Sequence, residues 1–201
     1  MILYDYWRSS ASYRVRIALN LKGLEFESRP VDLLAGAHKS PDHLKLNPLG
    51  RVPVFVDHDV SLTQSGAILQ HLERYGSSLW PENRARCQEL VDIIACDIHP
   101  ICNLGTVKAV CQAAGEDIKV QWMVTHMKIG LDALEAVCPE PQGPFCFGAQ
   151  PSMFEVYLIP QLYNAQRWGM DIEHWPKLAR LQAECSPLEA FAAAHPDKFQ
   201  P

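Results

Sequence analysis

Two adjacent serines, Ser9 and Ser10, stand where a strand-like segment gives way to a helical one. Unpaired backbone N–H groups and the positive end of the helix dipole favour an anion at such a place. A thiolate is one such anion, and a serine hydroxyl can donate a further hydrogen bond to it. The alternative, that one serine only caps the helix, stays open at this point.

A second candidate element is Val52-Pro53, where a proline opens an apparent strand. Proline lacks the N–H that a strand ladder needs, so it belongs at an edge or a bulge. A cis bond there would leave the backbone N–H and C=O of Val52 free to pair with an extended peptide. A trans edge proline is the alternative from the residues alone.

A third element, Gln64-Ser65, comes immediately before a helix. Ser65 can cap that helix, and the helix end together with the Gln64 amide can hold a carboxylate. Three potential anion or peptide sites therefore occur within the first 80 residues.

The hydrophobic period of residues 1–80 changes repeatedly, which is typical of alternating strands and helices. Gly23 stands where the C-terminal cap of the first helix is expected. The pattern predicts the order βαβ followed by ββα. The expected strands are 2–6, 25–31, 52–56 and 60–62, and the expected helices are 12–22 and 65–75.

Beyond a proline-centred linker at 79–83, the sequence has long helical periodicity and almost no strand signal. We expect two domains, 1–80 and 81–201, the second all-helical. Ser152 and Glu155 match a capping box, and Pro100 should kink its helix. The predicted helices lie near 83–112, 117–137, 152–168 and 175–193.

Composition narrows the class of protein. The formal net charge is −5 and no apolar run is long enough to span a membrane, so we expect neither a membrane nor a nucleic-acid partner. All seven cysteines lie beyond residue 86, with no CxxC pair and no zinc-site spacing. We expect buried free thiols in a cytoplasmic protein and no metal site.

The segment YWRSSASYRVRIALNLKG, residues 6–23, resembles the signature of the zeta-class glutathione transferases. The likeness continues through LNPLGRVP (46–53), QSGAI (64–68), DIHPICN (97–103) and PQLYNAQR (160–167), and so covers nearly the whole chain. The resemblance implies a thioredoxin-like α/β N-terminal domain, an all-α C-terminal domain and a homodimer. This family includes maleylacetoacetate isomerase and bacterial maleylpyruvate isomerase.

The resemblance also implies roles for residues in the first domain. Ser9 and Ser10 contact the sulfur of glutathione, and Val52, preceding a cis Pro53, pairs with its cysteinyl backbone. Gln64 and Ser65 hold the γ-glutamyl carboxylate. His38 stands where the family places a residue near the glycyl end.

In the second domain, the resemblance implies contributions to the site from Cys102, Asn103 and residues 106–108. Arg8 and Arg167 would pair with the carboxylates or the enolate of a small acidic substrate, the alternative for each being a structural salt bridge. His99 either lines the substrate cleft or is a hydrogen-bonded helix histidine.

The reaction implied is glutathione-dependent cis-trans isomerisation of maleylacetoacetate, in which a thiolate adds, a bond rotates and the thiolate leaves. Ala11 replaces the cysteine of many relatives, which disfavours reactions that need a protein thiol. Leu104 replaces an arginine of maleylpyruvate isomerases, which favours maleylacetoacetate. The alternatives are a transferase acting on electrophiles or α-haloacids, and a non-catalytic glutathione-binding module.

Overall fold

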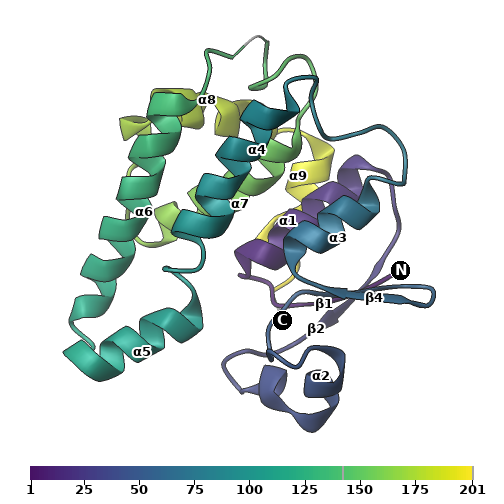
Figure 1. Ribbon diagram of the computed structural model, residues 1–201, viewed down its shortest axis with the longest axis vertical. Helices are drawn as coiled ribbons and strands as arrows, with labels where there is room; N and C mark the ends of the chain where they lie inside the picture. The colour runs from purple at the N-terminus through teal and green to yellow at the C-terminus, as the bar shows by residue number, and fades with distance from the viewer. Residues whose placement is uncertain (142, 201) are drawn as a thin grey trace. The chain divides into compact units, whose positions relative to one another are not determined.

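A computed structural model describes residues 1–141 and 143–200. The chain divides into two compact units (Figure 1). The first comprises residues 1–78 together with 187–201, and the second comprises residues 79–186. The C-terminal segment thus packs with the N-terminal residues, which a single division near residue 80 does not anticipate.

The sheet of the first unit consists of β1 (Ile2–Asp5), β2 (Glu27–Pro30), β3 (Val54–Asp57) and β4 (Val60–Thr63). Its order is β2-β1-β3-β4, with β1 parallel to β2 and β3 antiparallel to both β1 and β4. Leu3 and Phe55 pair in register and are fully buried. The predicted strands are confirmed in position, although the ends of each observed strand differ from the prediction by up to two residues.

The helices of the first unit are α1 (Ser10–Leu21), α2 (Pro41–Leu46), α3 (Ser65–Leu72) and α9 (Glu189–Ala194). Helices α1 and α3 lie side by side on one face of the sheet, and α9 packs against α1 (Figure 1). The predicted order βαβ followed by ββα is confirmed, as is the α/β fold of this part of the chain.

Capping residues fix both ends of the first helix. Ser9 caps it by accepting a hydrogen bond from the Ser12 N–H at 3.2 Å, so the helix begins two residues earlier than predicted. Gly23 follows the last turn with a φ of 63°, a conformation that glycine adopts without steric cost. The Gly23 and Leu24 N–H groups bond to the Asn20 and Leu19 carbonyls, a Schellman motif that confirms Gly23 as the stop.

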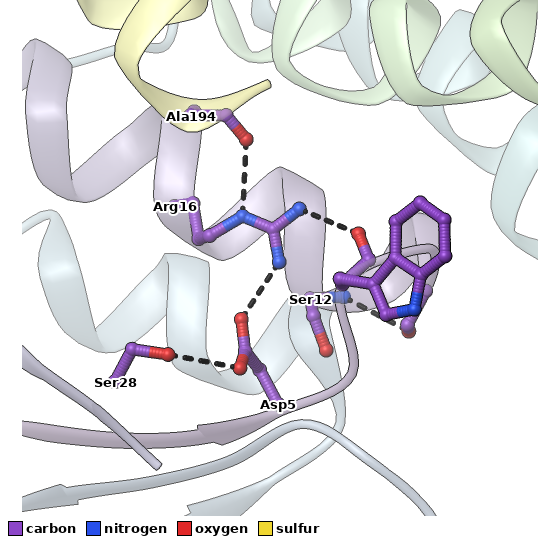
Figure 2. A network of polar contacts seen from close by, with 7 residues as sticks. Asp5, Ser12, Arg16, Ser28 and Ala194 are labelled. Atoms are coloured by element: carbon purple, nitrogen blue, oxygen red, sulfur yellow. Dashed lines mark hydrogen bonds and ion pairs between the residues drawn. The ribbon is translucent and has the colours of Figure 1, made fainter. Parts of the chain in front are cut away.

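A buried ion pair joins this helix to the central strand. Arg16 Nη1 lies 2.7 Å from Asp5 Oδ2, and the two side chains are 0% and 2% exposed. Arg16 Nε donates to the Ala194 carbonyl at 3.0 Å, and the Ser28 hydroxyl donates to Asp5 Oδ1 at 3.0 Å (Figure 2). One guanidinium therefore connects α1, β1 and the C-terminal segment.

The second unit is helical, as predicted. It contains α4 (Arg84–Asp92), a π-helical segment (Ile93–Ile98), α5 (Leu104–Ala114), α6 (Ile118–Val137), α7 (Met153–Arg167), a 3₁₀ turn (Ile172–His174) and α8 (Pro176–Cys185). The predicted capping box is confirmed at the start of α7, where Glu155 Oε2 accepts from the Ser152 N–H at 2.8 Å. Burial raises the pKa of Glu155.

The single helix predicted over 83–112 is wrong. The helical path ends after the π-helical segment, and α5 restarts at Leu104 behind an Asn103 cap. Pro100 lies in the intervening turns and has no N–H to continue a helix, so the predicted kink is a complete break.

The cysteines are free thiols, as predicted. Five are buried, but Cys96 is exposed and Cys102 is half-buried, so the expectation of uniform burial is wrong for these two. Within residues 1–141 and 143–200, no helix is both long and apolar enough to cross a lipid bilayer.

Asp57 at the end of β3 provides a test of how the sheet is held to α3. Its carboxylate accepts hydrogen bonds from His71 Nε2 at 2.9 Å and from the Tyr75 hydroxyl at 2.6 Å, which lower the pKa of Asp57 below its ordinary value. A lowered pKa contributes stability above about pH 4, and this contribution is lost as the pH falls through the folded-state value.

We expect Asp57→Asn to cost about 1–3 kcal/mol of unfolding free energy at pH 7 and less at pH 3. Urea denaturation at both pH values measures this difference. Asp59→Asn, an exposed carboxylate two residues away, is the matched control and should change neither value. An equal loss for Asp57→Asn at both pH values would contradict the assignment.

Candidate active site

The loop between β1 and α1 places the serine pair at the start of a helix. Ser9 is half-buried with extended backbone angles, and its N–H donates to the Tyr6 carbonyl at 2.8 Å. Its oxygen accepts the capping bond, so the hydroxyl proton can still be donated to a ligand. Ser10, 9% exposed, is the first residue of α1. Ser9 is therefore a cap, and capping does not exclude a role in holding an anion.

Arg8 lies on the aromatic residues that precede the serines. Its Nη2 donates to the Tyr6 hydroxyl at 3.0 Å, and the guanidinium carbon lies 4.6 Å from the centroid of the Trp7 ring. Among the described residues no carboxylate forms an ion pair with Arg8, so the salt-bridge alternative is not seen within this structure. A half-buried guanidinium on aromatic rings retains its charge for a bound anion.

The Val52-Pro53 peptide bond is cis, as the family resemblance implies. Val52 precedes β3 and lies outside its ladder, and its N–H and C=O pair with no other backbone group of the described residues. An extended peptide can therefore bond to Val52 by strand addition.

Two buried side chains hold the residue before this peptide bond. The Arg51 carbonyl accepts hydrogen bonds from His43 Nε2 at 2.9 Å and from Asn47 Nδ2 at 2.8 Å. The first bond requires the proton of His43 to be on Nε2. Residues 47–50 form a turn, in which the Gly50 N–H bonds to the Asn47 carbonyl at 2.8 Å.

At the start of α3, Gln64 occupies the cap position with a φ of 71°, a region that residues other than glycine rarely adopt. Its side chain is exposed and makes no capping bond. Ser65 is the first residue of the helix, so the expectation that Ser65 is the cap is wrong. Such strained conformations are retained mainly where a ligand or a tight connection requires them.

Arg14 is a residue of this site that the sequence patterns did not single out. Its Nη1 donates to Ser65 Oγ at 3.4 Å, and both residues are buried. With an arginine donor on its oxygen, the Ser65 hydroxyl still has its own proton to donate to a ligand. The guanidinium also places a positive charge behind the start of α3.

His38 lies in a short 3₁₀ turn, Ala37–Lys39, before α2. Its Nδ1 is buried and has no hydrogen-bond partner among the described residues. Burial, with smaller contributions from Lys39 and His43, lowers the pKa of His38, so its imidazole is neutral at pH 7.

The sheet topology brings three of these elements to one edge. Tyr4 of β1 and Thr63 of β4 both pair with Val54, and both strands run antiparallel to β3. The loop after β1, the Val52-Pro53 bond before β3 and the Gln64-Ser65 segment after β4 therefore lie at the same end of the sheet. Two helix N-termini, those of α1 and α3, begin there, which favours anionic groups.

The predicted residues of the second unit lie in two places. His99 follows the π-helical segment and continues its backbone hydrogen bonding, since its N–H bonds to the Ile94 carbonyl at 2.9 Å. Asn103 caps α5 by accepting from the Gly105 N–H at 3.2 Å. Burial raises the pKa of Cys102 to about 11, so its thiol is protonated at neutral pH.

Arg167 is the last residue of α7 and is exposed. Its Nη1 donates to Asn164 Oδ1 at 3.3 Å, and its guanidinium lies 6.0 Å from the Tyr163 ring centroid. Both neighbours lie within the preceding turn of the same helix and leave the guanidinium at the surface.

Comparison with known proteins agrees with this geometry. Residues 1–74 match the family model described as glutathione S-transferase, N-terminal domain. The maleylacetoacetate isomerase of Rhizobium meliloti strain 1021 is 47% identical over 208 residues, which cover 100% of this chain and 98% of that protein. The chain belongs to the zeta class of the glutathione transferases.

Solved structures extend the zeta-class likeness to the whole fold. The holo structure of a maleylpyruvate isomerase, a bacterial zeta-class enzyme, aligns with a TM-score of 0.94 and 36% identity, covering 100% of this chain and 99% of the other. The maleylacetoacetate isomerase of Anaeromyxobacter dehalogenans 2CP-1, with dicarboxyethyl glutathione and citrate bound, aligns with a TM-score of 0.86 and 37% identity, covering 100% and 92%.

The contact between Arg14 and Ser65 gives a prediction for this zeta-class chain. Ser65→Ala and Arg14→Lys should each weaken glutathione binding about five- to tenfold, because each removes part of the donor set at the start of α3. Cysteinylglycine lacks the γ-glutamyl group, so both variants should bind it as the unaltered protein does. Competition binding measures both ligands, and Ser61→Ala, an exposed serine of β4, is the control. Equal losses for both ligands would place Ser65 elsewhere.

Proposed function

We propose that this protein is a glutathione-dependent cis-trans isomerase that converts maleylacetoacetate to fumarylacetoacetate. One observation carries the proposal: the N-terminus of α1 presents Ser9 and Ser10 but no cysteine, in a chain 47% identical throughout to a maleylacetoacetate isomerase. Ala11 stands at the third position, so the sulfur must come from a bound thiol.

Glutathione would lie along the sheet edge that carries these elements. Its thiol would meet Ser9 and Ser10, its cysteinyl backbone would pair with Val52, and its γ-glutamyl carboxylate would meet Gln64 and Ser65. His38, neutral and partly buried, would serve the glycyl end. We propose that Cys102, as a neutral thiol, and Asn103 contribute to glutathione binding from the second unit. His99 would contribute to substrate binding.

The residue types suit the chemistry. A free thiol is mostly protonated at neutral pH, and a hydroxyl donor at a helix N-terminus favours the thiolate. The thiolate forms a C–S bond to the maleyl double bond, and the π electrons move onto the conjugated carbonyl as an enolate. The former double bond is then single and rotates. The enolate collapses, the C–S bond breaks and the thiolate is regenerated with the fumaryl product.

A ligand of one relative supports this sequence of steps. Dicarboxyethyl glutathione, bound to the Anaeromyxobacter dehalogenans isomerase, contains a four-carbon diacid joined to glutathione through sulfur. A thiol that has added to the double bond of maleate or fumarate has this connectivity. By analogy, we propose that Arg8 and Arg167 bind the carboxylates of the small acidic substrate or its enolate.

Maleylpyruvate is the competing substrate, because a maleylpyruvate isomerase is among the solved structures that this chain resembles over its whole length. Leu104 stands where maleylpyruvate isomerases have arginine, which favours maleylacetoacetate here. We further propose that the protein is a cytoplasmic homodimer that acts in the breakdown of tyrosine or related aromatic compounds.

A spectrophotometric assay of both substrates with glutathione tests the proposal. We expect a higher kcat/KM for maleylacetoacetate than for maleylpyruvate. Turnover of neither above the uncatalysed background would reject the isomerase. Conjugation of an α-haloacid would then identify a transferase, and retention on immobilised glutathione without any turnover would identify a binding module.

The serine pair is tested with variants that separate capping from catalysis. Glycine at an N-cap costs only a few tenths of a kcal/mol, so Ser9→Gly removes the hydroxyl with little loss of helix stability. We expect Ser9→Gly or Ser10→Ala to lower kcat about ten- to a hundredfold, the value of a hydrogen bond to a charged group. Ser9→Thr, which keeps a hydroxyl, is the control. Unchanged turnover in both variants would remove the serines from the mechanism.

The role of Arg167 is tested by measuring the binding of the acidic substrate separately from the binding of glutathione. Arg167→Ala should raise the KM for maleylacetoacetate about five- to tenfold and spare the affinity for glutathione, because the lost charge would face only the substrate carboxylate. Arg86→Ala is the control, because this arginine of the same unit is half-buried and paired with Glu89. An unchanged KM would show that Arg167 has no part in substrate binding.

A further inference from the structure

We propose that Arg16 is a positioning residue for the thiol-activating serines, and that the C-terminal segment 187–200 acts on thiol activation through it. The proposal rests on the proposed function, because it concerns how the Ser9-Ser10 site is held. Arg16 touches neither serine in the described contacts, so its action is through the loop.

The contact that matters is a hydrogen bond to the loop backbone. Arg16 Nη2 donates to the Trp7 carbonyl at 3.0 Å, two residues before Ser9. The Ser9 N–H bonds to the Tyr6 carbonyl, and the Ser9 carbonyl accepts from the Tyr13 N–H at 2.9 Å. The backbone of the loop is therefore hydrogen-bonded to Arg16 at Trp7 and to α1 at Ser9. These two bonds together fix the position of Ser9.

The same guanidinium is held by the C-terminal segment. Its Nε donates to the Ala194 carbonyl (Figure 2). Its central carbon lies 4.4 Å from the centroid of the Phe199 ring. The Tyr13 ring centroid lies 5.4 Å from the same carbon. The planar guanidinium of Arg16 thus contacts residues as far apart in the sequence as Trp7 and Phe199.

Only part of this arrangement is needed to neutralise the buried charge. Asp5 supplies the counter-ion, whereas the bonds to Trp7 and Ala194 are directional bonds from a planar fork to two carbonyls. A lysine ammonium is a compact point charge and cannot present three donors in one plane. Arg16→Lys should therefore keep the charge beside Asp5 and lose the geometry at Trp7.

Asn20 provides a matched control on the same helix. Its Nδ2 donates to the Ala190 carbonyl at 3.0 Å, so it also attaches the C-terminal segment to α1, but it lies at the end of the helix away from the serines. Asn20→Ala should loosen the segment without moving the loop. Phe199→Ala leaves the hydrogen bonds of Arg16 and removes only the ring beside the guanidinium.

The experiment measures the pKa of the bound glutathione thiol from its ultraviolet thiolate band. We expect Arg16→Lys to raise that pKa by about one pH unit, the size of the effect of a helix terminus on a charge, and Phe199→Ala to raise it less. Asn20→Ala should lower the melting temperature and leave the thiol pKa unchanged. A lower melting temperature with an unchanged thiol pKa in Arg16→Lys would reduce Arg16 to a structural ion pair and overturn the proposal.

Amide hydrogen exchange without glutathione separates this proposal from the proposed function. The Ser9 and Tyr13 amides should exchange faster in Arg16→Lys than in Asn20→Ala, and equal rates would overturn the proposal. If the unaltered protein shows no thiolate band with glutathione, the proposed function fails, and the exchange rates still decide the positioning role. If Arg16→Lys does not fold, the same two measurements on Phe199→Ala against Asn20→Ala decide it.

Discussion

The buried charge of Arg16 is the constraint on which the first unit depends. A guanidinium without solvent requires a counter-ion and hydrogen-bond acceptors, and leaving one member unpaired costs about 3–5 kcal/mol. Here Asp5 of the central strand supplies the counter-ion, and the carbonyls of Trp7 and Ala194 supply two of the acceptors. Strand β1, the serine loop, helix α1 and the C-terminal segment must therefore be in place together. This explains why residues 187–201 belong to the same compact unit as residues 1–78.

The directions of the strands bring the segments of the candidate site together at one end of the sheet. The two neighbours of β3, β1 on one side and β4 on the other, both run antiparallel to it, so β1 and β4 end where β3 begins. Segments near residues 9, 52 and 64 thereby share one sheet edge. The two helix N-termini favour anions there, while the cis bond at Pro53 presents the Val52 backbone to an extended peptide. A tripeptide with a thiol and a free γ-glutamyl carboxylate has the complementary chemistry.

Local sequence was sufficient where the deciding interactions are local. The spacing of apolar residues and Gly23 predicted the first helix, and Ser152 with Glu155 predicted the cap of α7. It was insufficient where partners lie far apart: Arg14 reaches Ser65 across 51 positions and Arg16 reaches Ala194 across 178. No local pattern indicates which buried arginine meets which carbonyl. The break at Pro100 was underestimated because a proline can kink or end a helix, and tertiary packing decides between the two.

Reversible addition places opposing demands on the sulfur, because the thiolate must attack in one step and leave in another. A thiolate with a very low pKa is a weak nucleophile, so strong stabilisation by a full charge would slow the attack. The donors proposed for the sulfur avoid this: the hydroxyl and backbone N–H groups are neutral, the charge of Arg8 is assigned to the substrate carboxylates, and the charge of Arg16 is balanced by Asp5. Arg16 can therefore shape the loop without adding net charge beside the sulfur. Ala11 completes the arrangement, since a bound thiol that must leave again has no protein thiol at the helix start with which to form a disulfide.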